Sequence, residues 1–161
     1  MDKFHKYGIG VWGAFIIGND HESPLYYKGL AKFLVHSGID IVQISILTPL
    51  PGTQLMDQLQ KEGSLVYQDF PQDWDKYRFS YMVHRPQGVE IDTVYTGNSY
   101  IKNRIYSFPT YQYRLIKSFL KLKSMRNFYA IYKSNQAGKK RWLNSQYYQK
   151  YPTIFKSDSE F

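Results

Sequence analysis

The first third of the chain contains two runs of apolar residues that predict two strands. Residues 8–17 (GIGVWGAFII) are almost entirely apolar, with β-branched and aromatic side chains, which is typical of a strand buried on both faces. Residues 39–48 form a second strand that is rich in isoleucine. A turn at residues 18–20 follows the first strand, and Pro49 and Pro51 cannot continue the second as a central strand. Both strands are therefore expected to end in loops.

A helix with clear start and stop signals is expected after each strand. Ser23 and Pro24 are typical of an N-cap and a first helical position, and Ser37-Gly38 ends this helix. Thr53 caps the next helix, which closes at Glu62-Gly63. The strand, helix and second strand predict one βαβ unit with parallel strands and a right-handed crossover. The side chains expected on the inner faces of the two helices are Tyr26, Leu30, Phe33 and Leu34, and then Leu55, Met56 and Leu59.

Regular structure weakens after the second helix and then becomes helical. Residues 64–88 show little periodicity; Trp74 is expected to anchor a loop there, and residues 78–84 to form a short strand. Residues 90–107 predict a helix that Pro109 interrupts.

The strongest helical pattern of the second half spans residues 111–126. Its inner face is expected to carry Leu115, Ile116, Phe119 and Leu122, and another face Arg114, Lys117 and Lys121. A short helix at 128–135, a basic turn at 138–141 and a tail at 147–161 complete the prediction.

Charge divides the chain into two halves. The net charge is +8, but it is unevenly distributed. Residues 1–92 hold 8 Lys or Arg and 11 Asp or Glu, whereas residues 93–161 hold 13 Lys or Arg and 2 Asp or Glu. Ten of the 16 tyrosines also lie in the second half. Basic residues among tyrosines can contact phosphates and stack on bases, so nucleic-acid binding through residues 93–157 is one interpretation. The other is an extension whose aromatic residues pack inward while its lysines are solvated.

The composition excludes several kinds of chemistry. There is no cysteine, so this chain offers no disulfide, no thiol nucleophile and no thiolate for an iron–sulfur cluster. The four histidines show no metal-ligand spacing, and the cluster of Asp69, Asp73 and Asp75 is typical of turns, so no metal site and no catalytic residue is predicted. No apolar run is long enough to cross a membrane, and residues 1–10 do not resemble a signal peptide. A cytoplasmic location is the expectation.

Several motifs resemble a known family. GAFIIGND (residues 13–20), ILTPLPGT (46–53) and KEGSL (61–65) resemble the C-terminal part of radical S-adenosylmethionine (SAM) enzymes of the cobalamin (B12)-binding type, a group that includes hopanoid-methylating enzymes. WDKY (74–77), VHRPQG (83–88) and RIYSFPT–YR (104–114) resemble that group's C-terminal extension.

The resemblance implies a fold and a divided chain. The fold would be α/β: the last two β/α units of a partial TIM-like (β/α)6 radical SAM barrel, followed by a mainly α-helical basic extension. The units would be residues 1–66 for the end of the barrel, 67–150 for the extension and 151–161 for a flexible tail.

The resemblance also implies a partial cofactor site. Gly13, Phe15, Ile16 and Gly18 match a glycine-rich motif that helps to form the SAM adenine site, and the loop with Thr48, Pro49, Pro51 and Gly52 would lie beside it. Asp20 follows the first strand, where a ribose-binding carboxylate would lie; alternatively it is a turn residue. Gly13 and Gly18 would either approach the ligand or allow close packing.

The chain departs from the family in one large respect. The CxxxCxxC motif that binds the 4Fe-4S cluster, the first four barrel strands and the cobalamin domain have no counterpart here. The resemblance therefore implies a C-terminal fragment that is inactive alone, holds part of the SAM site, binds neither cluster nor cobalamin, and has the missing N-terminal portion as its partner. The alternative is a stand-alone basic module that binds RNA or an acidic partner.

Overall fold

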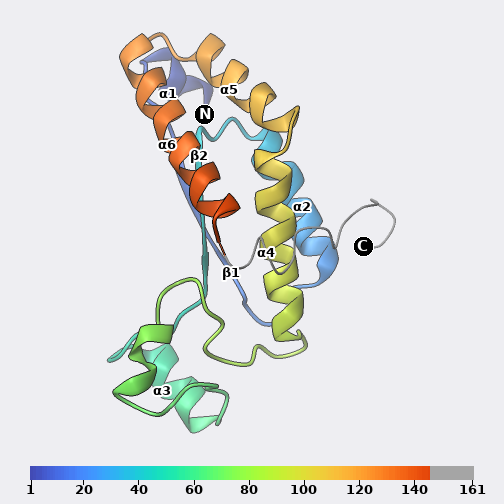
Figure 1. Cartoon of the computed structure of the whole chain (residues 1–161), viewed down its shortest axis with the longest axis vertical. Coiled ribbons are helices and arrows are strands. Elements are labelled where there is room, and N and C mark those ends of the chain that lie inside the picture. Colours follow the sequence, from blue (N-terminus) through green and yellow to red (C-terminus); the bar gives the residue numbers. More distant parts are fainter. Residues whose placement is uncertain (146–161) are drawn as a thin grey trace.

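A two-stranded parallel sheet forms the centre of the computed structural model, which describes residues 1–145 (Figure 1). Strand β1 (Trp12–Ile17) pairs with β2 (Ile41–Ile46) in register, from Trp12 opposite Ile41 to Ile17 opposite Ile46. Helix α2 (Pro24–His36) connects them, with the Ser23 hydroxyl accepting from the backbone N–H of Tyr26 at 3.4 Å. The predicted βαβ unit and mixed α/β fold are thus confirmed, although both strands are shorter than predicted.

The buried face of α2 agrees only in part with the predicted one: Leu34 is buried and Leu30 packs against the core, as predicted. Tyr26 and Phe33 were expected inside but are 43% and 52% exposed, whereas Tyr27 is 1% exposed. The reason is helix α4 (Ile91–Tyr106), which packs along α2 (Figure 1) and presents Gly97 to the Tyr27 ring. A Cβ atom at position 97 would lie 2.4 Å from that ring, so glycine allows this close approach. The sequence of α2 alone does not reveal which tyrosine meets this glycine.

Helices α2 and α4 cover one face of the sheet and form the main core with it. The core contains residues from both strands, both helices and the segments before β2 and α4: Ile17, Tyr27, Ala31, Leu34, Val35, Ile39, Ile46, Met82, Val94, Ile101 and Ile105. The other face of β1 is open, with Trp12 63% and Ile16 56% exposed. The prediction of a strand buried on both faces is therefore wrong for β1, because within residues 1–145 no layer covers that face.

Helix α3 (Gln54–Lys61) belongs to a separate small lobe at the lower end of Figure 1. Thr53 caps it as predicted, and Met56 and Leu59 are buried in a second apolar cluster with Leu65, Tyr77 and Val83. The short helix η1 (Gln72–Lys76) closes the lobe, where Trp74 stacks on Phe70 with ring centroids 4.1 Å apart. The predicted strand at 78–84 is wrong: only His84 forms a bridge, antiparallel to Leu65.

The basic half contains two helices in a different arrangement from the predicted one. Helix α5 (Thr110–Lys121) ends five residues earlier than predicted, because Ser124 caps the next helix through the N–H of Asn127. Helix α6 (Met125–Leu143) is continuous, so the expected short helix and basic turn at 138–141 are wrong. Gly138 lies inside α6, where a Cβ atom would meet the Tyr106 hydroxyl at 2.4 Å. Close packing, not a turn, accounts for this glycine.

The inner face of α5 was predicted only in part: Leu115 and Leu122 are buried as expected. Ile116 and Phe119 are 57% and 44% exposed, whereas Arg114, expected on an outer face, is 6% exposed. Arg114 is buried because its guanidinium reaches the carbonyl oxygens of Ile39 and Asp40, at 3.4 and 3.3 Å. A further helix, α1 (Asp2–Lys6), lies beside α5 at the upper end of Figure 1. None of the helices between residues 1 and 145 is long and apolar enough to cross a bilayer.

Candidate functional site

The carboxyl ends of β1 and β2 lie next to each other and form the candidate site. The N–H of Leu47 donates to the carbonyl of Ile17 at 2.8 Å, which joins the two strands where they end. Gly18 and Leu47 begin the loops that follow, and Thr48 comes next in the second loop. In α/β proteins with parallel strands, ligands bind at this edge, where loops leave the sheet.

A buried carboxylate holds the loop after β1. Glu22 is 6% exposed; its Oε2 atom accepts from the Gly18 N–H and from the Tyr27 hydroxyl, both at 2.8 Å, and its Oε1 atom accepts from the Asn19 side chain at 2.7 Å. Burial and the bond to Glu22 raise the pKa of the Tyr27 hydroxyl, which therefore stays a proton donor. These three bonds fix the backbone of Gly18, which has a φ of +90° that favours glycine.

Asp20 ties this loop to the segment before α4. Its Oδ1 atom accepts from the Gln87 N–H at 2.7 Å, and the His21 N–H donates to the Gln87 carbonyl at 2.8 Å. Asp20 itself is exposed. Asp20 therefore acts as a turn residue, and its carboxylate also lies at the surface beside the end of β1.

His84 lies beneath the same loop. It is 2% exposed, forms a hydrogen bond to the backbone of Gly18, and its Nδ1 atom has no partner among the described residues. Burial lowers the pKa of its imidazole, although the charge of Asp20 and the bond to Gly18 act in the opposite direction. The ring is thus neutral near pH 7 and contacts the end of β1 at the backbone of Gly18.

The loop after β2 is half buried and half exposed. Thr48 is 7% exposed and donates from Oγ1 to the Ile46 carbonyl at 3.1 Å, and Pro49 is fully buried. Pro51 and Gly52 lie at the surface, in a turn closed by the Thr53 hydroxyl, which donates to the Leu50 carbonyl at 2.7 Å. Of the predicted loop residues, Thr48 and Pro49 therefore lie closest to the sheet.

The predicted residues within β1 lie on two different faces. Gly13 and Phe15 alternate with Ile16, so they face the α2–α4 layer while Ile16 faces the open side. A Cβ atom at Gly13 would lie 3.0 Å from the Ile39 side chain, and one at Gly18 would lie 3.0 Å from the Met82 sulfur. Both glycines thus have packing roles, and Ile16 is the predicted strand residue with a side chain on the open face.

The sequence interpretation missed Glu22 and assigned no role to His84. One signal for Glu22 was available: it directly precedes the Ser23-Pro24 helix start, where a carboxylate is favoured by the helix dipole. His84 carries no local signal, because its contacts with Gly18 join segments more than sixty residues apart.

The opposite end of the sheet contains a second buried carboxylate. Asp40 accepts from the His5 ring at 2.8 Å and the Val11 N–H at 2.7 Å through Oδ2, and from the Ser118 hydroxyl at 2.6 Å through Oδ1. Its carbonyl accepts from the Asn135 side chain at 2.9 Å. Partners from α1, α5 and α6 converge here, which makes this end a structural junction.

The residues of this chain offer few ligands for a metal ion or an iron–sulfur cluster. No group of three or more His, Asp or Glu side chains in residues 1–145 could hold a metal ion. With no cysteine in the sequence, the chain cannot supply thiolates to an iron–sulfur cluster. An iron–sulfur cluster therefore does not fit the residues of this chain, whereas the exposed Asp20 and the open face at Ile16 are compatible with part of a SAM site.

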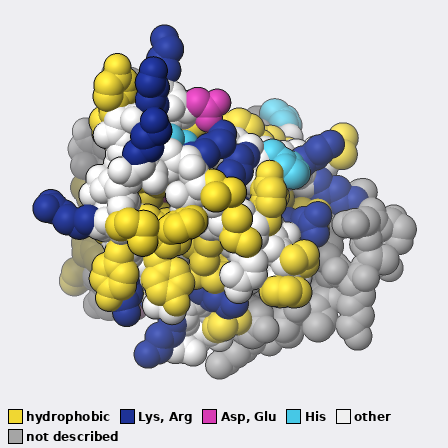
Figure 2. All heavy atoms as spheres, turned by 90° about the horizontal axis from the view of Figure 1, so that it is seen from above, with side chains coloured by type: hydrophobic (Ala, Val, Ile, Leu, Met, Phe, Trp, Pro, Cys, Tyr) yellow, Lys and Arg dark blue, Asp and Glu magenta, His cyan; other side chains and the backbone are white. Residues whose placement is uncertain are grey.

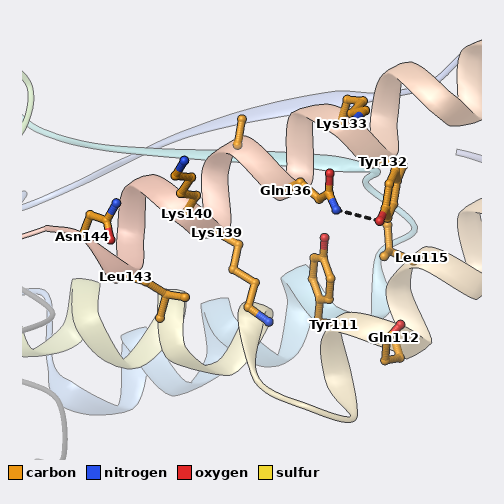
Figure 3. Close-up of a pocket in the computed structure, with 11 residues that line it drawn as sticks. Tyr111, Gln112, Leu115, Tyr132, Lys133, Gln136, Lys139, Lys140, Leu143 and Asn144 are labelled. Carbon is orange, nitrogen blue, oxygen red and sulfur yellow. Dashed lines mark hydrogen bonds between the residues drawn. The ribbon is translucent and has the colours of Figure 1, made fainter.

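A cavity of about 790 Å³ lies away from the strand ends, between α5 and α6 (Figure 3). It is adjoined by an apolar groove of about 330 Å³ between the same helices. Figure 2 looks onto the end of the molecule formed by α1, α5 and the start of α6, where apolar side chains gather and Lys and Arg surround them. The sequence did not predict this feature.

Comparison with known proteins identifies relatives that methylate their substrates. A hopanoid C-2 methylase from Rhodopseudomonas palustris is 41% identical over 64 residues, 40% of this chain and 12% of the relative. A bacteriochlorophyllide d C-12(1)-methyltransferase from Chlorobaculum tepidum is 29% identical over 87 residues, 54% of this chain and 18% of the relative. An uncharacterized methyltransferase from Pyrococcus horikoshii is 33% identical over 72 residues, which are 45% of this chain and 15% of the relative. No family model matches the chain.

These matches confirm the resemblance to hopanoid-methylating enzymes at the level of partial homology. The chain spans between 12% and 18% of the length of these relatives, so the greater part of each relative has no counterpart here. Homology to methylating enzymes therefore holds for about half of this chain.

Proposed function

We propose that this chain is the C-terminal part of a radical SAM methylating enzyme of the cobalamin-dependent type. The observation that carries the proposal is the partial match to the hopanoid and bacteriochlorophyllide methylating enzymes, over a small share of their length. In this proposal β1 and β2 are the last two strands of a TIM-like barrel. Helices α4, α5 and α6 are the family's C-terminal extension.

The shape of the sheet supports this assignment. Two parallel strands are few for an independent sheet. At its outer edge, β2 has the Ile46 N–H donating to the Phe79 carbonyl at 2.8 Å, and α6 contacts the same strand. In the described part of the chain β1 has no second neighbouring strand, and its open face exposes Trp12 and Ile16. A preceding barrel strand would pair with this edge, and the interior of the barrel would cover this face.

The residues at the strand ends would form one wall of the SAM site. Glu22 and His84 hold the Gly18 backbone rigid, so that the adenine ring can lie against it without reorganisation. Asp20 keeps one carboxylate oxygen outside its bond to Gln87 and would accept from a ribose hydroxyl. Thr48 and Pro49 would form the adjacent wall. The reductive cleavage of SAM belongs to the cluster bound by the missing portion, so this chain alone is expected to be inactive.

The partner would be the N-terminal radical SAM and B12-binding portion. The DNA beside this coding sequence should therefore encode a CxxxCxxC motif, in frame or in a neighbouring gene. We expect the two products to co-purify as a 1:1 complex when expressed together. An unrelated neighbouring sequence, or a chain that remains a clean monomer at high concentration with cooperative unfolding, would count against the proposal.

SAM binding tests the site within that complex. Isothermal titration under anaerobic conditions should detect SAM binding by the complex and none by this chain alone. Replacing Asp20 by Asn should weaken binding about tenfold, the cost of one hydrogen bond from a ligand hydroxyl to a charged acceptor. Asp69→Asn, a change at another exposed aspartate, is the matched control. Equal affinity of the Asp20→Asn and wild-type complexes would remove Asp20 from the site.

A further inference from the structure

The groove between α5 and α6 combines an apolar half with a cationic half. The apolar half, about 330 Å³, is lined by residues that include Leu115, Phe119 and Phe128. It shares Leu115 and Tyr132 with the adjoining cavity of about 790 Å³, which also contains Lys139. The two are therefore one continuous groove, and its size suits a ligand of small-molecule dimensions.

The cationic half of the groove contains an unsatisfied hydroxyl. Tyr111 is 7% exposed, and its Oη atom has no hydrogen-bond partner among the described residues. Figure 3 shows this hydroxyl pointing toward Gln136 and Tyr132, which lie across the cavity on α6. Burial raises the pKa of Tyr111, so the hydroxyl remains a donor at neutral pH. A buried donor without a partner is costly and is relieved by an acceptor from a ligand.

A cation lies over the ring of Tyr111 and has no acidic partner among residues 1–145. The Lys139 Nζ atom is 4.8 Å from the centroid of the Tyr111 ring, and Figure 3 shows its side chain turned toward Tyr111. No described salt bridge involves Lys139, and the sequence has no acidic residue from 93 to 157. Gln136 already donates to the Tyr132 hydroxyl at 2.6 Å and leaves a second amide hydrogen available. Three donors, from Tyr111, Gln136 and Lys139, therefore line one cavity to which residues 1–145 contribute no acidic side chain.

The apolar half of the groove supplies exposed apolar surface. Phe119 packs edge-on against Phe128, with ring centroids 5.1 Å apart, yet Phe119 is 44% and the neighbouring Ile116 57% exposed. Covering such surface is favourable at about 25 cal/mol per Å². A ligand that extends from Tyr111 toward Phe119 would thus satisfy both ends at once.

We propose that the α5–α6 groove binds an amphipathic organic anion, with its carboxylate or phosphate at Tyr111, Gln136 and Lys139 and its apolar portion along Leu115, Phe119 and Phe128. The groove lies toward the amino ends of the strands, opposite the edge proposed for SAM (Figure 1). This site goes beyond the methylating function and does not depend on it.

Decyl phosphate, below its critical micelle concentration, is the probe that tests the proposal. Isothermal titration of the full chain should detect saturable 1:1 binding of decyl phosphate, and much weaker binding of decanol and of inorganic phosphate, because each lacks one half of the ligand. Affinity should fall as salt rises. Equal binding of decanol, or no binding of decyl phosphate, would overturn the proposal.

Matched variants locate the ligand. Lys139→Gln should weaken decyl phosphate binding about tenfold, whereas Lys123→Gln, at an exposed lysine that lines neither part of the groove, should not. Tyr111→Phe removes only the unsatisfied hydroxyl and should weaken binding severalfold without loss of folding. Phe119→Ala should weaken binding about tenfold, and Leu120→Ala, which is 75% exposed outside the groove, should leave it unchanged.

Two outcomes identify a different occupant and overturn the proposal. If the two lysine variants and the two apolar variants all reduce affinity to the same extent, binding is a property of the basic surface and not of the groove. If the chain sediments with vesicles containing phosphatidylserine but does not bind soluble decyl phosphate, the surface docks on a membrane instead.

Discussion

Each end of the sheet holds one buried carboxylate, and the two are held in different ways. The carboxylate of Asp40, at the amino ends of the strands, receives bonds from residues 29 to 78 positions away in the sequence. Glu22, at the carboxyl ends, receives its bonds from residues no more than five positions away. The first carboxylate joins the extension to the sheet, and the second shapes one loop. Loss of Asp40 should therefore affect the whole molecule, and loss of Glu22 one strand end.

Replacing Asp40 by Ala should have the largest effect on folding. The change leaves His5, Ser118 and the Val11 N–H without their acceptor in a buried site. We expect the free energy of unfolding to fall by about 3–5 kcal/mol, the usual cost of breaking a buried hydrogen-bonded charge. Urea unfolding followed by circular dichroism measures this. Asp69→Ala, at an exposed position, should change stability by less than about 0.5 kcal/mol. A small effect of Asp40→Ala would mean that the extension docks through other contacts.

Replacing Gly97 by Ala should come next. The new Cβ atom would lie 2.4 Å from the Tyr27 ring, so α4 and α2 must separate or Tyr27 must leave Glu22. Overpacking of this kind costs about 1–3 kcal/mol. Gly29→Ala is the matched control, because nothing lies within 4 Å of its added Cβ atom, and it should stabilise α2 by about 0.5–1 kcal/mol. If both variants are stabilised, the α2–α4 contact is looser than described.

Replacing Glu22 by Gln should be milder and local. One acceptor for the Gly18 N–H, the Tyr27 hydroxyl or the Asn19 side chain is lost, at a cost of about 1–2 kcal/mol. Hydrogen exchange should accelerate at Gly18 and leave the amides of α5 and α6 unchanged. Faster exchange throughout α5 and α6 would abolish the distinction between the two ends of the sheet.

The pH dependence from His84 should be the smallest effect. Burial lowers the pKa of His84 in the folded chain below its ordinary value of 6.5, so the unfolded chain binds the proton more readily. The stability contributed by the neutral ring is therefore fully present above pH 6.5 and is lost as the pH falls through the pKa of the folded state. The difference in unfolding free energy between wild type and His84→Gln should shrink from pH 7 to pH 5. A constant difference would mean that His84 keeps its ordinary pKa.

Local signals predicted elements well where they depend on neighbouring residues. Ser23 and Thr53 cap α2 and α3 as predicted, because a cap needs only the next three residues. The faces of α2 and α5 were predicted less well, since burial depends on the element that packs against each helix. Tyr27 is buried because Gly97 faces it, and Arg114 because the carbonyl groups of Ile39 and Asp40 need donors.

The candidate site shows the same division. Gly18, Asp20 and Thr48 could be predicted at strand ends because the strands themselves could be predicted. Glu22 could not be distinguished from Asp20, since both acids follow the same strand and only the fold determines which is buried. The α5–α6 groove could not be predicted, because it needs α6 to be continuous through Gly138.

The sequence by itself determined the parallel βαβ unit, the caps at Ser23 and Thr53, the basic second half and the absence of cysteine, because these depend on residue type and short spacings. The tertiary structure alone decided which side chains are buried and which donors converge. His5, Ser118 and Asn135 meet at Asp40, and Tyr111 and Lys139 meet in one groove, although each set is dispersed along the chain. The physical reason is that desolvation and hydrogen bonding act between neighbours in space, and sequence distance does not specify those neighbours.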